Sequence, residues 1–156
     1  NLTGSLLIRC DKGHVYDTSF ASFKQGCRCK ICNMSIGEKS IEKWLINNNI
    51  KFTPQYKFPD CKYINALPFD FAVFDNENKL LCLIEYDGEQ HFESIEYFGG
   101  EEKLEITKIR DEIKNRYCED NNLVLIRIPF WEKDNINNIL DNTIKSKTTD
   151  GNNTPS

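Results

Sequence analysis

The chain has 156 residues, of which 39% are hydrophobic and 28% charged, with a formal net charge of -4 and a pI of about 5.3. This length predicts one domain, or one domain with a small module. No apolar run approaches the roughly 20 residues of a membrane-spanning helix, and the first residues lack the pattern of a secretory signal peptide. The acidic balance argues against a nonspecific basic coat for nucleic acid. It does not exclude a nuclease, because an acidic metal site lowers the net charge of the sequence.

The distribution of the seven cysteines indicates a metal site rather than a disulfide framework. A secreted disulfide framework would spread its cysteines more evenly, and usually in even number. We therefore expect an intracellular protein in a reducing compartment. Four of the seven lie close to the N-terminus: Cys10, Cys27, Cys29 and Cys32.

Residues 1–34 predict a zinc ribbon. A Cys-x3-His pair with a glycine at the turn precedes a Cys-x2-Cys pair, and thiolates and imidazole nitrogens are the ligands of structural zinc. A segment this short lacks a core of its own, so the metal would supply its folding energy. Cys27 is a surplus thiol and could replace Cys29 as a ligand. The expected zinc ligands are Cys10, His14, Cys29 and Cys32.

An α/β domain is expected over residues 35–145, beginning with a helix and three strands. Ser35 and Glu38 match a capping box that opens the helix. The strand over 51–58 contains a proline, which predicts an edge position. Strands over 67–75 and 80–87 flank a hairpin turn, and the second is nearly all apolar, so it should be central.

The second half of this domain completes the sheet. After a long loop, a helix over 104–122 leads to a buried strand over 123–130, and a short helix over 135–144 follows. The strands before and after the long helix should be parallel, with a right-handed crossover. This order predicts an α/β fold with a mixed sheet flanked by helices. Residues 146–156 predict a disordered polar tail.

Acidic residues gather in the two hairpin strands. Asp70 lies between two phenylalanines, and Glu85 and Asp87 share one side of the next strand because side chains alternate. If the strands form a hairpin, Asp70 and Glu85 become cross-strand neighbours. Converging carboxylates need a cation, and oxygen ligands suit Mg²⁺ or Mn²⁺. Either Glu85 or Asp87 could instead face solvent. His91, just beyond the strand, could move a proton.

The sequence resembles the PD-(D/E)XK nuclease superfamily. The resemblance is closest to the branch of very-short-patch-repair endonucleases and the homing endonucleases of phages and large viruses. It covers roughly residues 8–140 and rests on Gly37-Glu38, LPFDF, IEYDGEQHF, Arg110-Asp111, Lys114, LIRIPF and the N-terminal Cys/His ribbon. It implies a restriction-endonuclease-like fold and a Mg- or Mn-dependent DNA endonuclease that hydrolyses phosphodiester bonds, of homing or patch-repair type.

The resemblance also implies roles for individual residues. Asp70 would be the central metal ligand, and Glu85 stands at the second acidic position. Asp87 occupies the place where the superfamily usually has lysine, so the role of that lysine must pass to another residue. His91 is the substitute that the patch-repair branch suggests.

Three further residues would support the site by resemblance. Glu38 would contact the metal-bound water, although it could simply cap its helix. Asp111 and Arg110 would lie near the site, although Asp111 could instead pair with Lys108 or Lys114 on the helix surface.

The expected partner is double-stranded DNA, and no membrane is expected. Residues 1–34 carry five basic and two acidic residues, a net charge of +3 that would help to hold the duplex backbone. Phe130 and Trp131 are expected in the core. The predicted DNA contacts are Lys24, Arg28, Lys30 and Arg127, of which Arg127 could instead pair with an acid.

A second function remains open from the sequence. With aspartate at position 87 in place of lysine, the chain could be a catalytically inactive, zinc-containing module that binds nucleic acid or protein. Because cutting both strands usually needs a dimer or two passes, a homodimer is one expectation. Since the sequence begins at Asn1 rather than Met, an additional upstream domain is another.

Overall fold

The computed structural model describes residues 4–92 and 100–145. The chain divides into two compact units, Asn1–Ile36 and Gly37–Ser156. The division falls two residues after the end of the predicted zinc ribbon. The tail predicted over 146–156 lies outside the described residues.

The first unit is built on a two-stranded antiparallel sheet of β1 (Ser5–Arg9) and β2 (Val15–Ser19). In the turn between them, the backbone N–H of Gly13 donates to the carbonyl of Cys10 at 2.9 Å. Gly13 has a φ of 84°, which glycine adopts without steric cost. The glycine turn expected within the Cys-x3-His pair is therefore confirmed. A short helix, α1 (Phe20–Lys24), follows.

The second unit contains a four-stranded mixed sheet in the order β3-β4-β5-β6. β3 (Lys51–Lys62), β4 (Ala66–Phe74) and β5 (Leu80–Asp87) are antiparallel, and β6 (Leu125–Pro129) joins β5 in parallel. The predicted mixed sheet, the edge position of β3 and the central position of β5 are confirmed. β6 forms the other edge, and only alternate residues of it are buried.

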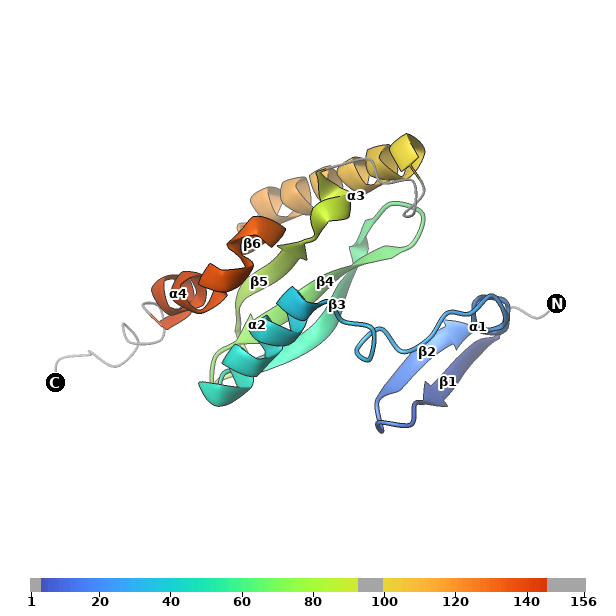
Figure 1. Ribbon diagram of the computed structural model, residues 1–156, viewed down its shortest axis with the longest axis horizontal. Coiled ribbons are helices and arrows are strands. Elements are labelled where there is room, and N and C mark those ends of the chain that lie inside the picture. The colour runs from blue at the N-terminus through green and yellow to red at the C-terminus, as the bar shows by residue number, and fades with distance from the viewer. Residues whose placement is uncertain (1–3, 93–99, 146–156) are drawn as a thin grey trace, which may run out of the picture. The chain divides into compact units, whose positions relative to one another are not determined.

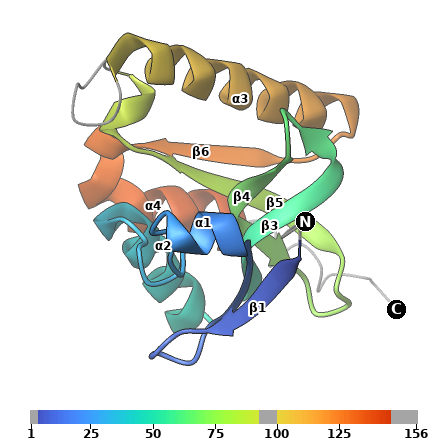
Figure 2. The same cartoon turned by 90° about the vertical axis from the view of Figure 1, so that its right-hand side faces the viewer.

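Helices cover both faces of this sheet (Figures 1 and 2). α3 (Gly100–Asp120) lies on one face, and α2 (Ile36–Asn47) and α4 (Ile136–Leu140) lie on the other. A Cβ atom added at Gly37 would come within 2.1 Å of the Tyr86 ring. The glycine therefore lets α2 lie directly against β5.

The remaining elements are short helical segments. The predicted loop after β5 contains η1 (Glu89–His91), and α3 begins four residues earlier than expected. The predicted short helix is α4, preceded by η3 (Phe130–Asn135) and extended by a π-helical turn, η4 (Asp141–Lys145). In the described part of the chain, no helix is long and apolar enough to cross a bilayer.

One expectation about the core was wrong. Trp131 is 58% exposed, and Phe130 is only partly buried. Trp131 packs instead against Phe92, whose ring centre lies 4.6 Å from its own. The reason is that β6 ends at Pro129, so both residues lie on η3 and not on the sheet.

The core between the sheet and α3 positions the candidate site. Cys82 is buried in β5, as predicted. The burial of apolar side chains on this face fixes the height of α3 above β4 and β5. The central buried residues of this cluster are Cys61, Leu67, Phe69, Ala72, Leu83 and Cys118.

Candidate active site and metal centre

Asp70 and Glu85 lie side by side where β4 and β5 part. Phe71 pairs with Ile84, and one step further along the same register brings Asp70 opposite Glu85. There the side-chain carboxylates, rather than backbone carbonyls, accept hydrogen bonds from the opposite strand. Oδ2 of Asp70 accepts from the backbone N–H of Tyr86 at 2.7 Å, and Oε1 of Glu85 accepts from the N–H of Asp70 at 3.2 Å. The expected cross-strand proximity of the two acids is confirmed.

The neighbouring strand is irregular at the same level. Gln55 of β3 lies between the residues paired with Phe69 and Phe71, and its φ is 53°. This left-handed conformation costs about 1–2 kcal/mol for a residue with a Cβ atom. The backbone opposite Asp70 is thus strained, a condition that clusters at functional sites.

A buried lysine neutralises Glu85. Nζ of Lys114, on α3, donates to both carboxylate oxygens of Glu85 at 2.8 and 2.9 Å. The two residues are only 8% and 3% exposed. Burial raises the pKa of Glu85, and the charges of Lys114 and Arg127 only partly oppose that effect.

Asp70 lies in an excess of negative charge. Burial raises the pKa of its carboxyl well above the usual range, and the charges of Glu85 and Glu38 add to the increase. The N–H of Tyr86 and the charge of Lys114 oppose it only in part. Glu38, on α2, is therefore near enough for its charge to act on Asp70. A cation at this point would relieve the repulsion.

A second group of polar residues lies beyond the end of β5. Nδ1 of His91 is 2.8 Å from Oδ2 of Asp111 and 3.7 Å from Oδ1 of Asp87. Arg127, on β6, donates to Asp87 at 2.6 Å and to Asp111 at 3.3 Å. Its Nε donates to Asn115 at 2.9 Å. This network joins η1, α3, β5 and β6.

The charges of this network favour an imidazolium. Partial burial lowers the pKa of His91, but the hydrogen bond to Asp111 and the charges of Asp111 and Asp87 raise it more, so its pKa is above the ordinary 6.5. Burial raises the pKa of Asp111, but His91 and Arg127 lower it more, so the net shift is downward. A carboxylate beside His91 therefore favours a proton on Nδ1.

Oxygen and nitrogen atoms of Asp87, His91 and Asp111 lie within 4.8 Å of one another, close enough to hold a metal ion. However, Arg127 already supplies positive charge to both carboxylates, and the raised pKa of His91 means that a proton competes with a metal ion for its ring. We therefore interpret this set as a hydrogen-bonded network. Asp70 and Glu85 contribute only two ligand residues, and they belong to no set of three close ligands within the described residues.

The first unit brings together the four predicted metal ligands. The side chains of Cys10, His14, Cys29 and Cys32 could bind a metal ion. Nδ1 of His14 lies 3.4 Å from the sulfurs of Cys10 and Cys32 and 3.6 Å from that of Cys29. The sulfurs of Cys10 and Cys32 are 3.6 Å apart. Cys27 is exposed and lies outside the cluster, so Cys29 rather than Cys27 belongs to this set of possible ligands.

The predicted DNA contacts fall into two environments. Lys24, Arg28 and Lys30 are exposed on the first unit. The guanidinium of Arg28 lies 4.5 Å from the centre of the Phe23 ring. Arg127, by contrast, is held inside the acidic network, where it neutralises carboxylates instead of facing an open surface.

Arg110 does not join the acidic residues in any hydrogen bond or ion pair found among the described residues. It is exposed on α3, and its guanidinium lies 5.8 Å from the centre of the Tyr63 ring. Its neighbour Asp111 does enter the network, where it pairs with His91 rather than with Lys108 or Lys114 of its own helix.

Sequence reasoning missed two residues of the site. It gave Lys114 no role there, although this lysine neutralises Glu85, and it overlooked Asn115, which accepts from Arg127. A signal was present: Asp111, Lys114, Asn115 and Cys118 recur at the i, i+3, i+4, i+7 spacing of one helix face. A lysine within such a face indicates a partner on the element against which the face packs.

Comparison with known proteins gives one family. The model of the family described as "Protein of unknown function (DUF2726)" matches residues 61–146, more than half of the chain. The match includes β4, β5, α3 and β6 and therefore nearly all of the acidic site. Glu38 and the four metal ligands of the first unit lie outside it.

Two viral proteins are similar to part of the chain. Uncharacterized protein 307L of Invertebrate iridescent virus 6 is 41% identical over 67 residues, which is 42% of this chain and 34% of the viral protein. Uncharacterized protein 033L of Invertebrate iridescent virus 3 is 35% identical over 51 residues, 32% of this chain and 26% of that protein. The chain thus spans about a third or less of these relatives. No solved structure matches it significantly.

Proposed function

This chain belongs to the family described as "Protein of unknown function (DUF2726)". For this member of the family, we propose the function of a metal-dependent DNA endonuclease of the PD-(D/E)XK type with a zinc-binding N-terminal module. One observation carries the proposal: Asp70 and Glu85 are held side by side where two strands part, and burial together with the charges of Glu85 and Glu38 raises the pKa of Asp70. The fold would be restriction-endonuclease-like, and the activity of homing or patch-repair type.

The chemistry of these acids fits Mg²⁺ or Mn²⁺. Proteins commonly hold Mg²⁺ through one or two carboxylates, and water and substrate phosphates complete the octahedron. Asp70 and Glu85 would be those carboxylates. Bound there, the ion would stabilise charge on the phosphate and lower the pKa of the attacking water. Glu38 would accept a hydrogen bond from that water.

Lys114 could take the role of the lysine that the superfamily usually has at position 87. Its ammonium group lies against both oxygens of Glu85, on the carboxylate that would face the reacting phosphate. The cation that related nucleases usually carry on the strand would then come from α3. Lys114 would orient Glu85 and offset its charge when a phosphate approaches.

His91 would transfer a proton. Its Nδ1 is directed to Asp111, which leaves Nε2 to face the substrate. Because its pKa is raised, the ring keeps its proton to higher pH than an ordinary imidazole and would act as the acid that protonates the leaving oxygen. Asp111 and the Arg127–Asp87 pair would hold the ring in position.

The spacing of Cys10, His14, Cys29 and Cys32 supports zinc. With bonds of about 2.3 Å to sulfur and about 2.05 Å to nitrogen, a tetrahedral site separates two sulfurs by about 3.8 Å and a sulfur from a nitrogen by about 3.6 Å. The corresponding distances here are 3.6 Å between sulfurs and 3.4 to 3.6 Å between sulfur and nitrogen.

The exposed basic side chains of the first unit support DNA as the partner. Lys24, Arg28 and Lys30 would contact phosphates without reading sequence. The two relatives are viral proteins, which agrees with the resemblance to nucleases of phages and large viruses.

The test is cleavage of supercoiled plasmid in Mg²⁺ by the wild type and by Asp70→Asn. The substitution removes a ligand charge and keeps the side-chain shape, so we expect cleavage to fall about a thousandfold or more. DNA binding without metal should stay equal or improve, because the change relieves repulsion between the site and phosphate. His91→Ala should cost about 100- to 10,000-fold.

The matched control is Glu77→Gln, which neutralises an exposed acid in the hairpin turn at the other end of the same strands. It should cut at the wild-type rate. If Asp70→Asn also cuts at that rate, the active-site assignment fails. If the wild type binds DNA but cuts nothing in Mg²⁺ or Mn²⁺, the chain is the inactive binding module.

A further inference from the structure

Tyr86 connects β4, β5 and α2. Its backbone N–H, in β5, donates to Oδ2 of Asp70 at 2.7 Å. Because side chains alternate along a strand, its side chain leaves β5 on the face opposite to that of Glu85. There the ring lies against Gly37, the second residue of α2. One residue thus holds a candidate metal ligand through its backbone and meets the helix of Glu38 through its ring.

The contact between Tyr86 and Gly37 leaves no room for a side chain at position 37. A Cβ atom there would overlap Cζ, Cε1 and Cε2 of the ring, and even the farthest of the three would be 2.5 Å away. Because carbon atoms pack at about 3.5–4.0 Å, an alanine would displace either the first turn of α2 or the ring by about 1 Å. Glu38 follows Gly37 directly, so this contact keeps the backbone beside Glu38 close to β5.

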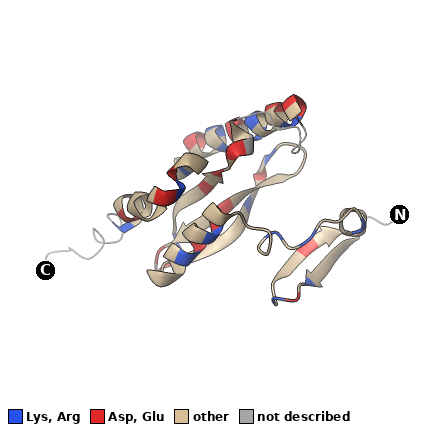
Figure 3. Ribbon diagram, in the orientation of Figure 1, with Lys and Arg blue, Asp and Glu red and all other residues tan. Residues whose placement is uncertain are grey.

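The carboxylate of Glu38 acts on both strands. Burial is the main cause of the raised pKa values of Asp70 and Tyr86, and the charge of Glu38 adds to both. Figure 3 shows acidic residues in α2 as well as in the strands that this helix covers. The rest of α2 is anchored by Ile41 and Leu45, which are both 0% exposed. The ring of Tyr86 therefore supports the first turn in particular.

We propose that Tyr86 is a positioning residue, whose ring sets the distance between Glu38 and the two acids Asp70 and Glu85. The inference rests on the proposed function, because it needs a metal ion at these two acids. A residue in the outer shell of a metal site typically changes metal affinity or activity by about 10- to 100-fold. The role belongs to the ring, and the hydroxyl group is not required for it.

The experiment measures Mn²⁺ binding to the full chain by electron paramagnetic resonance, with zinc already bound so that the cysteines do not take up the probe ion. Asp70→Asn should abolish the binding. Tyr86→Ala and Gly37→Ala should each weaken it about tenfold or more, whereas Tyr86→Phe, which keeps the ring, should bind as the wild type does. Plasmid cleavage in Mg²⁺ should follow the same order.

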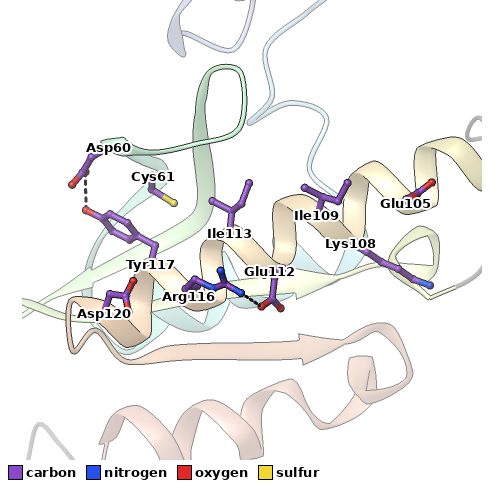
Figure 4. Close-up of a pocket in the computed structure, with 10 residues that line it drawn as sticks. All are labelled: Asp60, Cys61, Glu105, Lys108, Ile109, Glu112, Ile113, Arg116, Tyr117 and Asp120. Carbon is purple, nitrogen blue, oxygen red and sulfur yellow. Dashed lines mark hydrogen bonds and ion pairs between the residues drawn. The ribbon is translucent and has the colours of Figure 1, made fainter.

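A second comparison separates positioning from a general loss of structure. Glu38→Gln removes the charge but keeps a residue type that completes the capping box, and it should also weaken Mn²⁺ binding. If the ring acts through Glu38, Tyr86→Ala weakens binding in the wild type but not in Glu38→Gln. The matched control, Glu105→Gln, neutralises an exposed acid in a groove of about 620 Å³ along α3, on the other face of the sheet (Figure 4), and should leave binding unchanged.

The outcomes for Tyr86 and for the metal site are distinguishable. Wild-type binding in Tyr86→Ala or in Glu38→Gln, losses that multiply in the double variant, or equal losses in Tyr86→Phe and Tyr86→Ala would each overturn the inference. In those cases, an Mn²⁺ site that depends on Asp70 would leave the proposed function standing. A wild type without such a site would overturn both.

Discussion

Glu85 and Lys114 form an ion pair in which both residues are buried. Burying both costs desolvation energy, so the intact pair adds little to stability. Removing one partner is different, because the remaining charge stays buried without compensation. The pair is thus better understood as a device that orients Glu85 than as a source of stability.

This leads to a prediction for Lys114→Met. The variant should lose about 3–5 kcal/mol of unfolding free energy, measured by urea denaturation, because Glu85 is left buried and unpaired. Adding Glu85→Gln should recover much of the loss. Lys103→Met, at an exposed lysine of the same helix, should change stability by less than about 0.5 kcal/mol. A similarly small loss for Lys114→Met would show that the pair is not formed.

At the residue scale, the acids were predictable and their partners were not. Asp70 and Glu85 stand out in sequence because they interrupt apolar strands, and strand alternation indicates which side they share. Helical periodicity likewise marks the face of α3 that holds Lys114. It does not determine which residue of β5 lies across from that face, since this depends on the crossover between them. For the same reason, the sequence left open whether Arg127 faces DNA or the acids.

At the scale of elements, His91 and Asp111 tie η1 to α3. The folded-state pKa of His91 is raised above its ordinary 6.5. A raised pKa means that the protonated ring stabilises the folded state. This contribution is complete below pH 6.5, and it is lost as the pH rises through the folded-state value.

We therefore predict that the stability advantage of the wild type over His91→Gln is largest in acid and shrinks as pH rises. Unfolding free energies measured between about pH 5.5 and pH 9 would test this. Asp111→Asn should flatten the same pH dependence, because it removes the main partner of the ring. An advantage that stays constant over this range would mean that the ion pair does not form.

Several elements were predicted from local pattern, and the deviations have local causes. The hairpin turn between β4 and β5 is held by Asp75, which exchanges backbone hydrogen bonds with Lys79 and Asn78. The first turn of α3 contains polar residues, so the apolar periodicity that predicted the helix begins only after it. β1 and β2 were not foreseen, since strands of five residues give too short a pattern to stand out in the sequence.

At the scale of the whole molecule, the two units have different sources of stability. The second has an extensive core, whereas the first has few buried residues within its range. Four groups around one metal ion would replace that missing core. The stability of the first unit should therefore follow metal occupancy, and that of the second should not.

We predict that Cys32→Ser loses one equivalent of zinc and unfolds the first unit. Cys27→Ser, which removes the exposed thiol outside the cluster, should keep both the zinc and the fold. Elemental analysis combined with limited proteolysis would measure the two effects. The second unit should resist protease in both variants. A folded first unit in metal-free protein, or loss of zinc in Cys27→Ser, would contradict the ligand assignment.

The parallel pairing of β5 with β6 also sets an order of assembly. β3, β4 and β5 form two sequential hairpins that close through local contacts, whereas β6 pairs with β5 across about forty intervening residues. Such long-range pairing forms late because loop closure must precede it. On the ribosome, Asp70 and Glu85 can therefore meet while Arg127 has yet to be synthesised. Asp87 and Asp111 remain without their guanidinium until then, so a nascent chain carries an unfinished site.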